Sequence, residues 1–261
     1  MFKLLVIATI VGIASSPAAA QPKTDSVTLT ERQHQVGDKW TEEKKEVSDL
    51  ILTANGKKMP LKSERHEKRT VEVLAVDKTG PSRAKYTFTT DTETKIAPAP
   101  GGGPTAIQGK TYTLSFGDPY TIAGSQGAVP AAEEDLVRKR VKRFGKADHL
   151  GKLLAGKTFV KGKLVKLSVA ELTEAAPDPD LKLVAMTLVY TGMRADRALF
   201  DVTMKGEGSK GSSTMTLDFK GKIEVDPKTN TPLDARMEAV VKQTGANTVE
   251  GTLRMTTIRT K

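Results

Sequence analysis

Hydrophobic and polar residues alternate along most of this chain. The segment STMTLDFKGKIEVD places Met215, Leu217, Phe219, Ile223 and Val225 on one face and threonines, lysines and acidic residues on the other. A period of two sustained over a whole segment predicts a long β-strand with one buried face. The same alternation predicts further strands around 71–75, 86–88, 112–116, 165–169, 184–190, 200–204, 233–241 and 249–255.

Turn-forming residues separate these segments. Asn55-Gly56 is typical of a tight hairpin turn, and Gly, Pro, Asn and Asp gather at 77–82, 176–180, 192–196, 226–232 and 244–248. Short connections between half-buried strands favour an antiparallel meander in which one face packs and the other meets solvent.

Two segments in the middle of the chain have helical patterns. In VPAAEEDLVRKRVKRFGK, Pro130 precedes acidic residues, basic residues fill the last turns, and Gly145 stands where a helix would end. DHLGKLLAG follows, with leucines at helical spacing. The expected fold is therefore mainly β (α+β): a curved antiparallel meander sheet, or two packed half-sheets, with a central helical pair.

The helical pair carries an apolar stripe that must cover something. If the helices and the sheet fit incompletely, this stripe would line an apolar cleft able to take a hydrophobic ligand. We favour the closed form, because the helix ends look well defined. The candidate cleft residues are Leu136, Val137, Val141, Phe144, Leu150, Leu153 and Leu154.

The chain begins with the features of a secretory signal. Lys3 precedes an apolar run that is too short to span a bilayer, and Ala18-Ala19-Ala20 supplies small residues at a cleavage position. We expect a signal peptide at 1–20 and a single exported β-rich domain at 21–261, periplasmic or extracellular. Within that domain we expect a helical insertion at about 130–156 and an unpacked Pro/Gly surface loop at 97–106.

The amino-acid composition excludes disulfides but does not identify a partner. The chain has no cysteine, so disulfides are excluded, and its formal net charge is +10. Positive charge suits contact with an anionic envelope surface, but the charges are interspersed along the strands, which is also the pattern of an ordinary soluble surface.

Two motifs suggest nucleotides or nucleic acid and are rejected. GKLLAGKT, residues 151–158, matches the phosphate-binding loop pattern, but that chemistry needs a strand before the loop and a helix after it. Here a helix is expected first and a strand second. The basic run RKRVKRFGK lacks the interleaved aromatic residues of a nucleic-acid site, so we read it as the solvated face of a helix.

No catalytic, cofactor-binding or metal-binding set emerges from the sequence. Ser82-x-x-Lys85 lies beside Lys78-Thr79-Gly80 in the wrong order for a penicillin-interacting serine enzyme. The histidines, His34, His66 and His149, lack metal-ligand spacing. Glu42 and Glu43 would point to opposite faces of a strand, so they cannot share acid–base work.

Three phrases resemble uncharacterised exported bacterial β-sheet proteins. They are QVGDKW at 35–40, LLAGKTFVKGKLVKL at 153–167 and GKIEVDPKTNTPLDARMEA at 221–239. The resemblance implies a β-sheet fold, and it implies neither an activity nor any catalytic residue.

The leading hypothesis is an exported, non-enzymatic binding or scaffold protein without a cofactor. One alternative is a periplasmic carrier that holds a lipid or other apolar ligand in a half-barrel cleft. Another is a hydrolase whose residues the sequence does not reveal. The expected partners are an anionic envelope surface or an apolar ligand, with no nucleic acid and no transmembrane segment in the mature chain.

Overall fold

The computed structural model of the chain describes residues 25–31, 33–78, 80–117, 119–125, 127–142, 144, 149–175, 182–210 and 212–261. The expected signal peptide at 1–20 and the turn expected at 176–180 lie outside these residues. None of the helices in the described part of the chain is long and apolar enough to cross a membrane.

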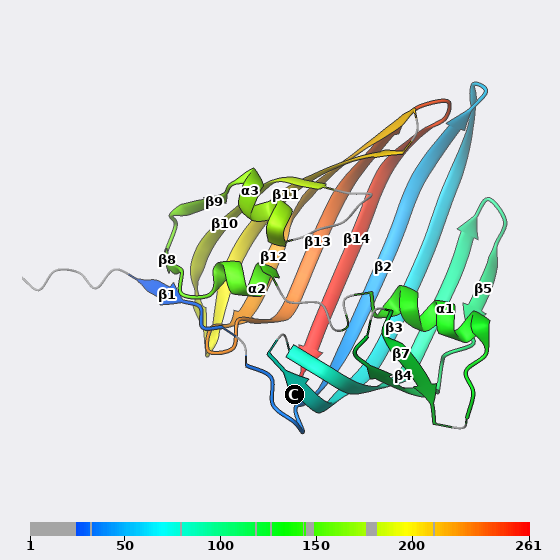
Figure 1. The fold of residues 1–261 in the computed structure, drawn as a ribbon. Helices are drawn as coiled ribbons and strands as arrows, with labels where there is room; N and C mark the ends of the chain where they lie inside the picture. The colour runs from blue at the N-terminus through cyan, green and yellow to red at the C-terminus, as the bar shows by residue number, and fades with distance from the viewer. Residues whose placement is uncertain are drawn as a thin grey trace, which may run out of the picture.

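The fold is mainly β, as the alternation predicts (Figure 1). The strands are β1 (Ser26–Thr28), β2 (Lys39–Ala54), β3 (Lys57–Asp77), β4 (Gly80–Ala97), β5 (Gly101–Pro104), β6 (Thr111–Ser115), β7 (Thr121–Gly124), β8 (Thr158–Val160), β9 (Leu164–Leu167), β10 (Lys182–Arg194), β11 (Arg197–Lys210), β12 (Ser213–Asp226), β13 (Thr231–Thr244) and β14 (Thr248–Thr260). The helices are α1 (Ala131–Arg140), α2 (His149–Leu154) and α3 (Val169–Ala175).

Two antiparallel meanders join to make one large sheet. Over the described residues it has 12 strands, in the order β7-β6-β4-β3-β2-β14-β13-β12-β11-β10-β9, with β5 beside β4. The N-terminal meander runs from β2 to β7 and the C-terminal meander from β9 to β14, and they meet where β2 pairs with β14. Of the two expected arrangements, the single meander sheet is confirmed. A separate two-stranded sheet pairs β1 with β8.

The hairpins form at the predicted turns. Asn55 and Gly56 have φ angles of 51° and 74°, and a type I′ turn needs positive φ at both central positions. Ala195 and Asn230 also take positive φ, at the tips of the β10–β11 and β12–β13 hairpins.

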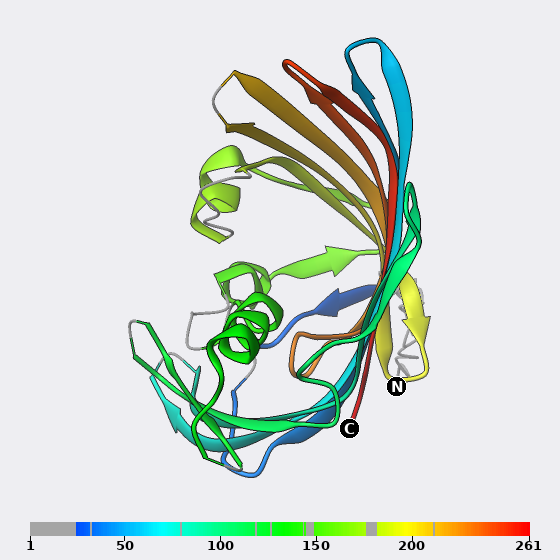
Figure 2. The same cartoon turned by 90° about the vertical axis from the view of Figure 1, so that its right-hand side faces the viewer.

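The sheet is strongly curved, and the helices lie on its concave side (Figure 2). Register shifts interrupt the β3–β4, β10–β11 and β12–β13 pairings. Such bulges bend and twist a sheet, which accounts for part of the curvature. We call the concave side the inner face and the opposite side the outer face.

The inner face carries two separate core clusters. One lies on the N-terminal meander and packs Tyr86, Phe88 and Tyr112 against α1 and the residues that follow it. The other lies on the C-terminal meander, where Tyr190 and Phe200 pack with residues of β1, β8, α2 and α3. Each meander therefore has a core of its own, and the β2–β14 pairing lies between them.

The helices differ from the expected central pair. α1 covers one end of the sheet, and α2 and α3 cover the other (Figure 1). α3 occupies residues expected to extend a strand to position 169. Its start is fixed by Ser168 and Glu171: the backbone N–H of each residue donates to the side chain of the other, which is a capping box.

α1 is shorter than predicted. The helix ends at Arg140, because Val141 leaves the helical conformation with φ −122° and ψ 41°. The glycine expected to cap it, Gly145, is outside the described residues. Glu134 and Arg138, four residues apart on α1, pair with each other, with Arg138 Nε donating to Glu134 Oε1 over 3.0 Å.

The Pro/Gly segment at 97–106 is not simply an unpacked loop. Its residues Gly101–Pro104 form β5, which pairs with Thr92–Lys95 of β4. Gly102 has φ +103°, and a Cβ there would collide with the carbonyl oxygen of Glu93. The glycines that suggested a linker therefore allow a close approach between two strands.

Candidate functional site

A continuous set of apolar side chains covers much of the inner face beyond the two cores. The backbone register places Leu217 of β12 opposite Val241 of β13, Val241 opposite Gly251 of β14, and Gly251 opposite Leu50 of β2. The neighbouring inward positions are also apolar. We call the whole set the apolar inner surface: Leu50, Leu52, Leu61, Met215, Leu217, Phe219, Met237, Ala239, Val241, Val249, Leu253 and Met255.

Most of these side chains are only half-buried. By contrast, Phe88 and Tyr190 in the cores have 0% exposure. Figures 1 and 2 show the reason: β2, β12, β13 and β14 extend toward their hairpins beyond all three helices. Apolar area left in water costs about 25 cal/mol per Å², so a continuous half-exposed set of this kind indicates a binding surface.

The outer face of the same strands is mainly charged and polar, with single exposed apolar residues at Val47, Ile51, Val240 and Ile258. The positions that alternate with the apolar inner surface include Asp218, Lys220 and Lys222 on β12, Glu238 and Lys242 on β13, and Glu250 and Arg254 on β14. The two faces of one sheet therefore differ sharply, and the apolar face is the concave one.

Farther from the β2–β3 hairpin, the inner positions of β2, β3 and β4 change from apolar to ionic. Arg69 lies at the centre of this part. It contacts Glu42 and Glu67 at 2.8 Å each, and its Nη1 donates to the backbone carbonyl of Arg140 at the end of α1. We call the group the ion cluster: Glu42, Lys44, Arg65, Glu67, Arg69, Asp91, Arg140 and Arg259.

The ion cluster connects three parts of the fold. Arg140 reaches from α1 to Asp91 on β4, with Nε 2.9 Å from Oδ1. Arg259 reaches from β14 to Glu42 on β2, with Nη2 2.7 Å from Oε2. Arg140, expected on the solvated face of a basic helix, is instead buried and paired, so that expectation is wrong for this residue.

Glu42 is ionised at all ordinary pH values. Its burial alone would raise the pKa, but the charges of Arg69, Lys44 and Arg259 outweigh burial and hold the pKa well below the usual 4.5. A carboxylate held so firmly in its charged form cannot exchange protons with a substrate near neutral pH. Its geometry fits a structural role.

Glu42 and Glu43 do point to opposite faces. Glu42 is buried in the ion cluster, whereas Glu43 lies on the outer face, paired with Lys45 at 3.1 Å and with His66 at 2.9 Å. The prediction that these neighbouring carboxylates point to opposite faces of a strand is therefore confirmed.

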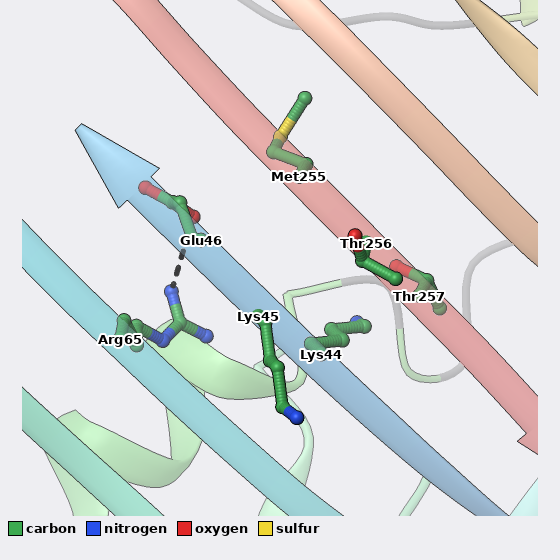
Figure 3. Close-up of a pocket in the computed structure, with 7 residues that line it drawn as sticks. All are labelled: Lys44, Lys45, Glu46, Arg65, Met255, Thr256 and Thr257. Atoms are coloured by element: carbon green, nitrogen blue, oxygen red, sulfur yellow. Dashed lines mark ion pairs between the residues drawn. The ribbon is translucent and has the colours of Figure 1, made fainter. Parts of the chain in front are cut away.

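A small pocket lies where the apolar inner surface meets the ion cluster (Figure 3). Its volume is about 60 Å³. The inward-facing residues around it come from β2, β3 and β14 and combine both chemistries. They are Lys44, Glu46, Arg65, Met255 and Thr257, and the neighbouring residues Lys45 and Thr256 also line the pocket.

The candidate cleft residues from the helical segments divide between the two cores. Val137, Val141 and Phe144 are buried in the N-terminal core, with Leu136 packed against it. Leu154 is buried in the C-terminal core, and Leu153 packs beside it. The side chain of Leu150 is outside the described residues. The structure does not gather these residues into one site, and a cleft lined by them remains a prediction.

The nucleotide-loop match has the order of elements that the sequence indicates. α2 comes first, Gly156 follows with φ +75°, and β8 begins at Thr158. Lys157 donates to Glu171 of α3 over 3.2 Å. This is the reverse of the strand–loop–helix order that phosphate binding requires.

Sequence reasoning named neither the apolar inner surface nor the ion cluster. The alternating strands contain the first signal, since the pattern places Leu217 and Phe219 on a buried face. The second lay in KWTEEKKE at 39–46, where charged residues occupy both faces of a strand. Among the described residues, no group of three or more potential ligands could hold a metal ion.

Comparison with known proteins identifies no family. No protein-family model matches the chain, and no curated protein matches it. One solved structure that matches is titled "Lipid-protein interactions in lipovitellin", with a TM-score of 0.47 and 12% sequence identity. The match covers 88% of this chain and 26% of the other, so this chain spans about a quarter of that protein. A likeness at this level transfers no property to this chain.

Proposed function

We propose that this protein is a non-enzymatic carrier that binds a lipid or another apolar ligand on the inner face of its sheet. The observation that carries the proposal is the apolar inner surface, a half-exposed set of side chains on a concave sheet whose outer face is charged. Binding an apolar chain there would remove hydrophobic area from water, which is the main driving force for such association.

The curvature also favours a ligand over a flat protein partner. A concave face surrounds an elongated molecule on several sides and can bury most of its area. The half-exposed methionines Met215, Met237 and Met255 add side chains that adapt to ligands of differing shape. A scaffold that used only its polar outer face would gain nothing from keeping this surface partly open.

Titration with a fluorescent fatty acid tests the proposal. We expect saturable binding with a fixed stoichiometry. Leu217→Glu should weaken it at least about tenfold, because a carboxylate in the apolar inner surface must be desolvated when a chain covers it. Thr216→Glu adds the same group to the outer face of the same strand and should leave binding unchanged.

Thermal unfolding of both variants shows whether they remain folded at the titration temperature. Absence of saturable binding by the unaltered protein would contradict the proposal, and so would an equal loss in both variants. We also propose, from the N-terminal pattern alone, that the carrier acts outside the cytoplasm, which sequencing the N-terminus of the protein from its host would test.

A further inference from the structure

The border between the apolar inner surface and the ion cluster combines two chemistries on adjacent strands. The register places Met255 of β14 opposite Glu46 of β2 and Thr257 opposite Lys44, so uncharged side chains on β14 lie beside charged ones on β2. The pocket of about 60 Å³ lies at this point. It is far too small for an acyl chain, but it has room for a polar group the size of a few water molecules.

The positive charge of Lys44 is only partly neutralised, because the nearby carboxylate of Glu42 is shared with other cations. Its Nζ lies 2.8 Å from Glu42 Oε1, and Arg69 Nη2 lies 2.8 Å from the same oxygen. The other oxygen of Glu42 accepts from Arg259. One carboxylate therefore serves three cations. The Lys44 side chain is 37% exposed, so its ammonium group can donate to a further acceptor from the open side.

Arg65, on β3, also has guanidinium N–H groups that are not engaged in hydrogen bonds. Its Nη2 donates to Glu67 over 2.6 Å, and its Nη1 lies 4.0 Å from Glu46, beyond hydrogen-bonding distance. Its Nε is buried and has no hydrogen-bond partner in the described part of the chain. Figure 3 shows Arg65 on β3, Lys44 on β2, and Met255 and Thr257 on β14, with β2 between the other two strands.

Taken by itself, the ion cluster has more cations than carboxylates. In the ion cluster, over the described residues, the cations are Lys44, Arg65, Arg69, Arg140 and Arg259, and the buried carboxylates are Glu42, Glu67 and Asp91. The two further carboxylates nearby, Glu46 and Glu93, have side chains that are 43% and 52% exposed. With these two the formal charges balance, so an anion would be held by the unshared N–H groups of Lys44 and Arg65 and not by a net positive charge.

We propose that the ligand is an anionic lipid, with its head group at the border between Lys44 and Arg65 and its chain on the apolar inner surface. This inference rests on the proposed carrier function and specifies its ligand class. A carboxylate or phosphate would accept hydrogen bonds from both cations. The apolar side chains of β12, β13 and β14 begin beside it, so one amphiphilic molecule would match both regions at once.

A fatty acid with a fluorophore on its tail, compared with its methyl ester, tests the charge requirement. The two probes share one chain and differ in the charge of the head group. We expect the acid to bind at least about tenfold more tightly than the ester. Lys44→Gln and Arg65→Gln should each weaken binding of the acid several-fold and leave the ester unchanged, while Lys68→Gln, an equal loss of charge on the outer face, should change neither.

Glu46→Gln keeps the test decisive if the cation variants fail to fold. This half-exposed carboxylate lines the pocket, and its neutralisation should tighten binding of the acid about threefold without affecting the ester. Unchanged acid binding in Glu46→Gln would overturn the inference. Equal affinity for acid and ester would also overturn it while leaving the carrier function intact, and absence of binding by both probes would refute the carrier function itself.

Discussion

Glu42 is the residue on which the ion cluster depends most. Its carboxylate receives Arg69 from β3, Arg259 from β14 and Lys44 from its own strand. Removing one partner of a buried ion pair leaves the others uncompensated, which costs about 3–5 kcal/mol. We expect Glu42→Gln to lower the free energy of unfolding by that amount at pH 7, as measured by urea denaturation.

Glu43→Gln is the matched control. It makes the same chemical change one residue away on the outer face, where Glu43 pairs with Lys45 and His66 near solvent. Exposed pairs contribute about 0–1 kcal/mol, so this variant should remain close to the unaltered protein. If both variants lose the same stability, the ion cluster does not have the role assigned to it.

The effect of Glu42 should depend on pH in a defined direction. Because its pKa is lower in the folded protein than the ordinary 4.5, the ionised carboxylate contributes stability that is fully present above pH 4.5. That contribution is lost as the pH falls below this value. The stability difference between the unaltered protein and Glu42→Gln should therefore shrink steadily from pH 4.5 downward. A difference that stays constant to pH 3 would contradict this account.

At the scale of elements, α2 contains the first part of GKLLAGKT, and its packing shows that this segment is the end of a helix and not a phosphate-binding loop. Leu154 ends the helix inside the C-terminal core, where it is 8% exposed. Leu154→Asp should destabilise the protein by about 2–4 kcal/mol, since it both empties a core position and buries a charge. Lys152→Asp places the same side chain on the exposed side of the same helix and should cost far less.

Urea denaturation of the two variants measures this difference, and calorimetry with ATP provides a second readout. If the segment is a helix end and not a phosphate loop, the unaltered protein should show no heat of binding. ATP binding that Lys157→Ala abolishes would overturn the assignment.

The elements that the sequence predicts best are those with an apolar inner face. β12 and β13 alternate cleanly, because every second side chain meets a core or the apolar inner surface. β2 is not recognised by this alternation, because its inward positions Glu42, Lys44 and Glu46 are charged. The usual contrast between an apolar and a polar face is therefore missing. α3 had a readable signal in Ser168-x-x-Glu171, which is the spacing of a capping box.

The candidate site could be predicted only in part for a similar reason. Alternation identifies which residues share a face, but it does not reveal which part of that face a helix covers. The ion cluster depends on pairs far apart in the chain, such as Arg140 with Asp91, 49 residues away, and Arg259 with Glu42, 217 residues away. Local patterns carry no information about such contacts.

At the scale of the whole molecule, the β2–β14 pairing makes one sheet of two meanders that each have a core. Gly251 on β14 lies at this seam with φ +151°, and a Cβ there would collide with the carbonyl oxygen of Asp49 on β2. Gly251→Ala should therefore cost more than about 1 kcal/mol. Gly101→Ala, at a position with open space around it and an ordinary φ, should cost little.

Weakening the seam should also change how the protein unfolds. Trp40, the single tryptophan, packs against the N-terminal core, and Arg259 of β14 lies over its ring. Its fluorescence therefore follows the N-terminal meander and the seam, while far-ultraviolet circular dichroism follows the whole sheet. In the unaltered protein we expect the two signals to change together in urea, as in a cooperative transition. In Gly251→Ala they should separate, because each meander retains its own core after the strands between them part. Coincident transitions in the variant, at the midpoint of the unaltered protein, would show that the two cores are coupled by contacts other than this seam.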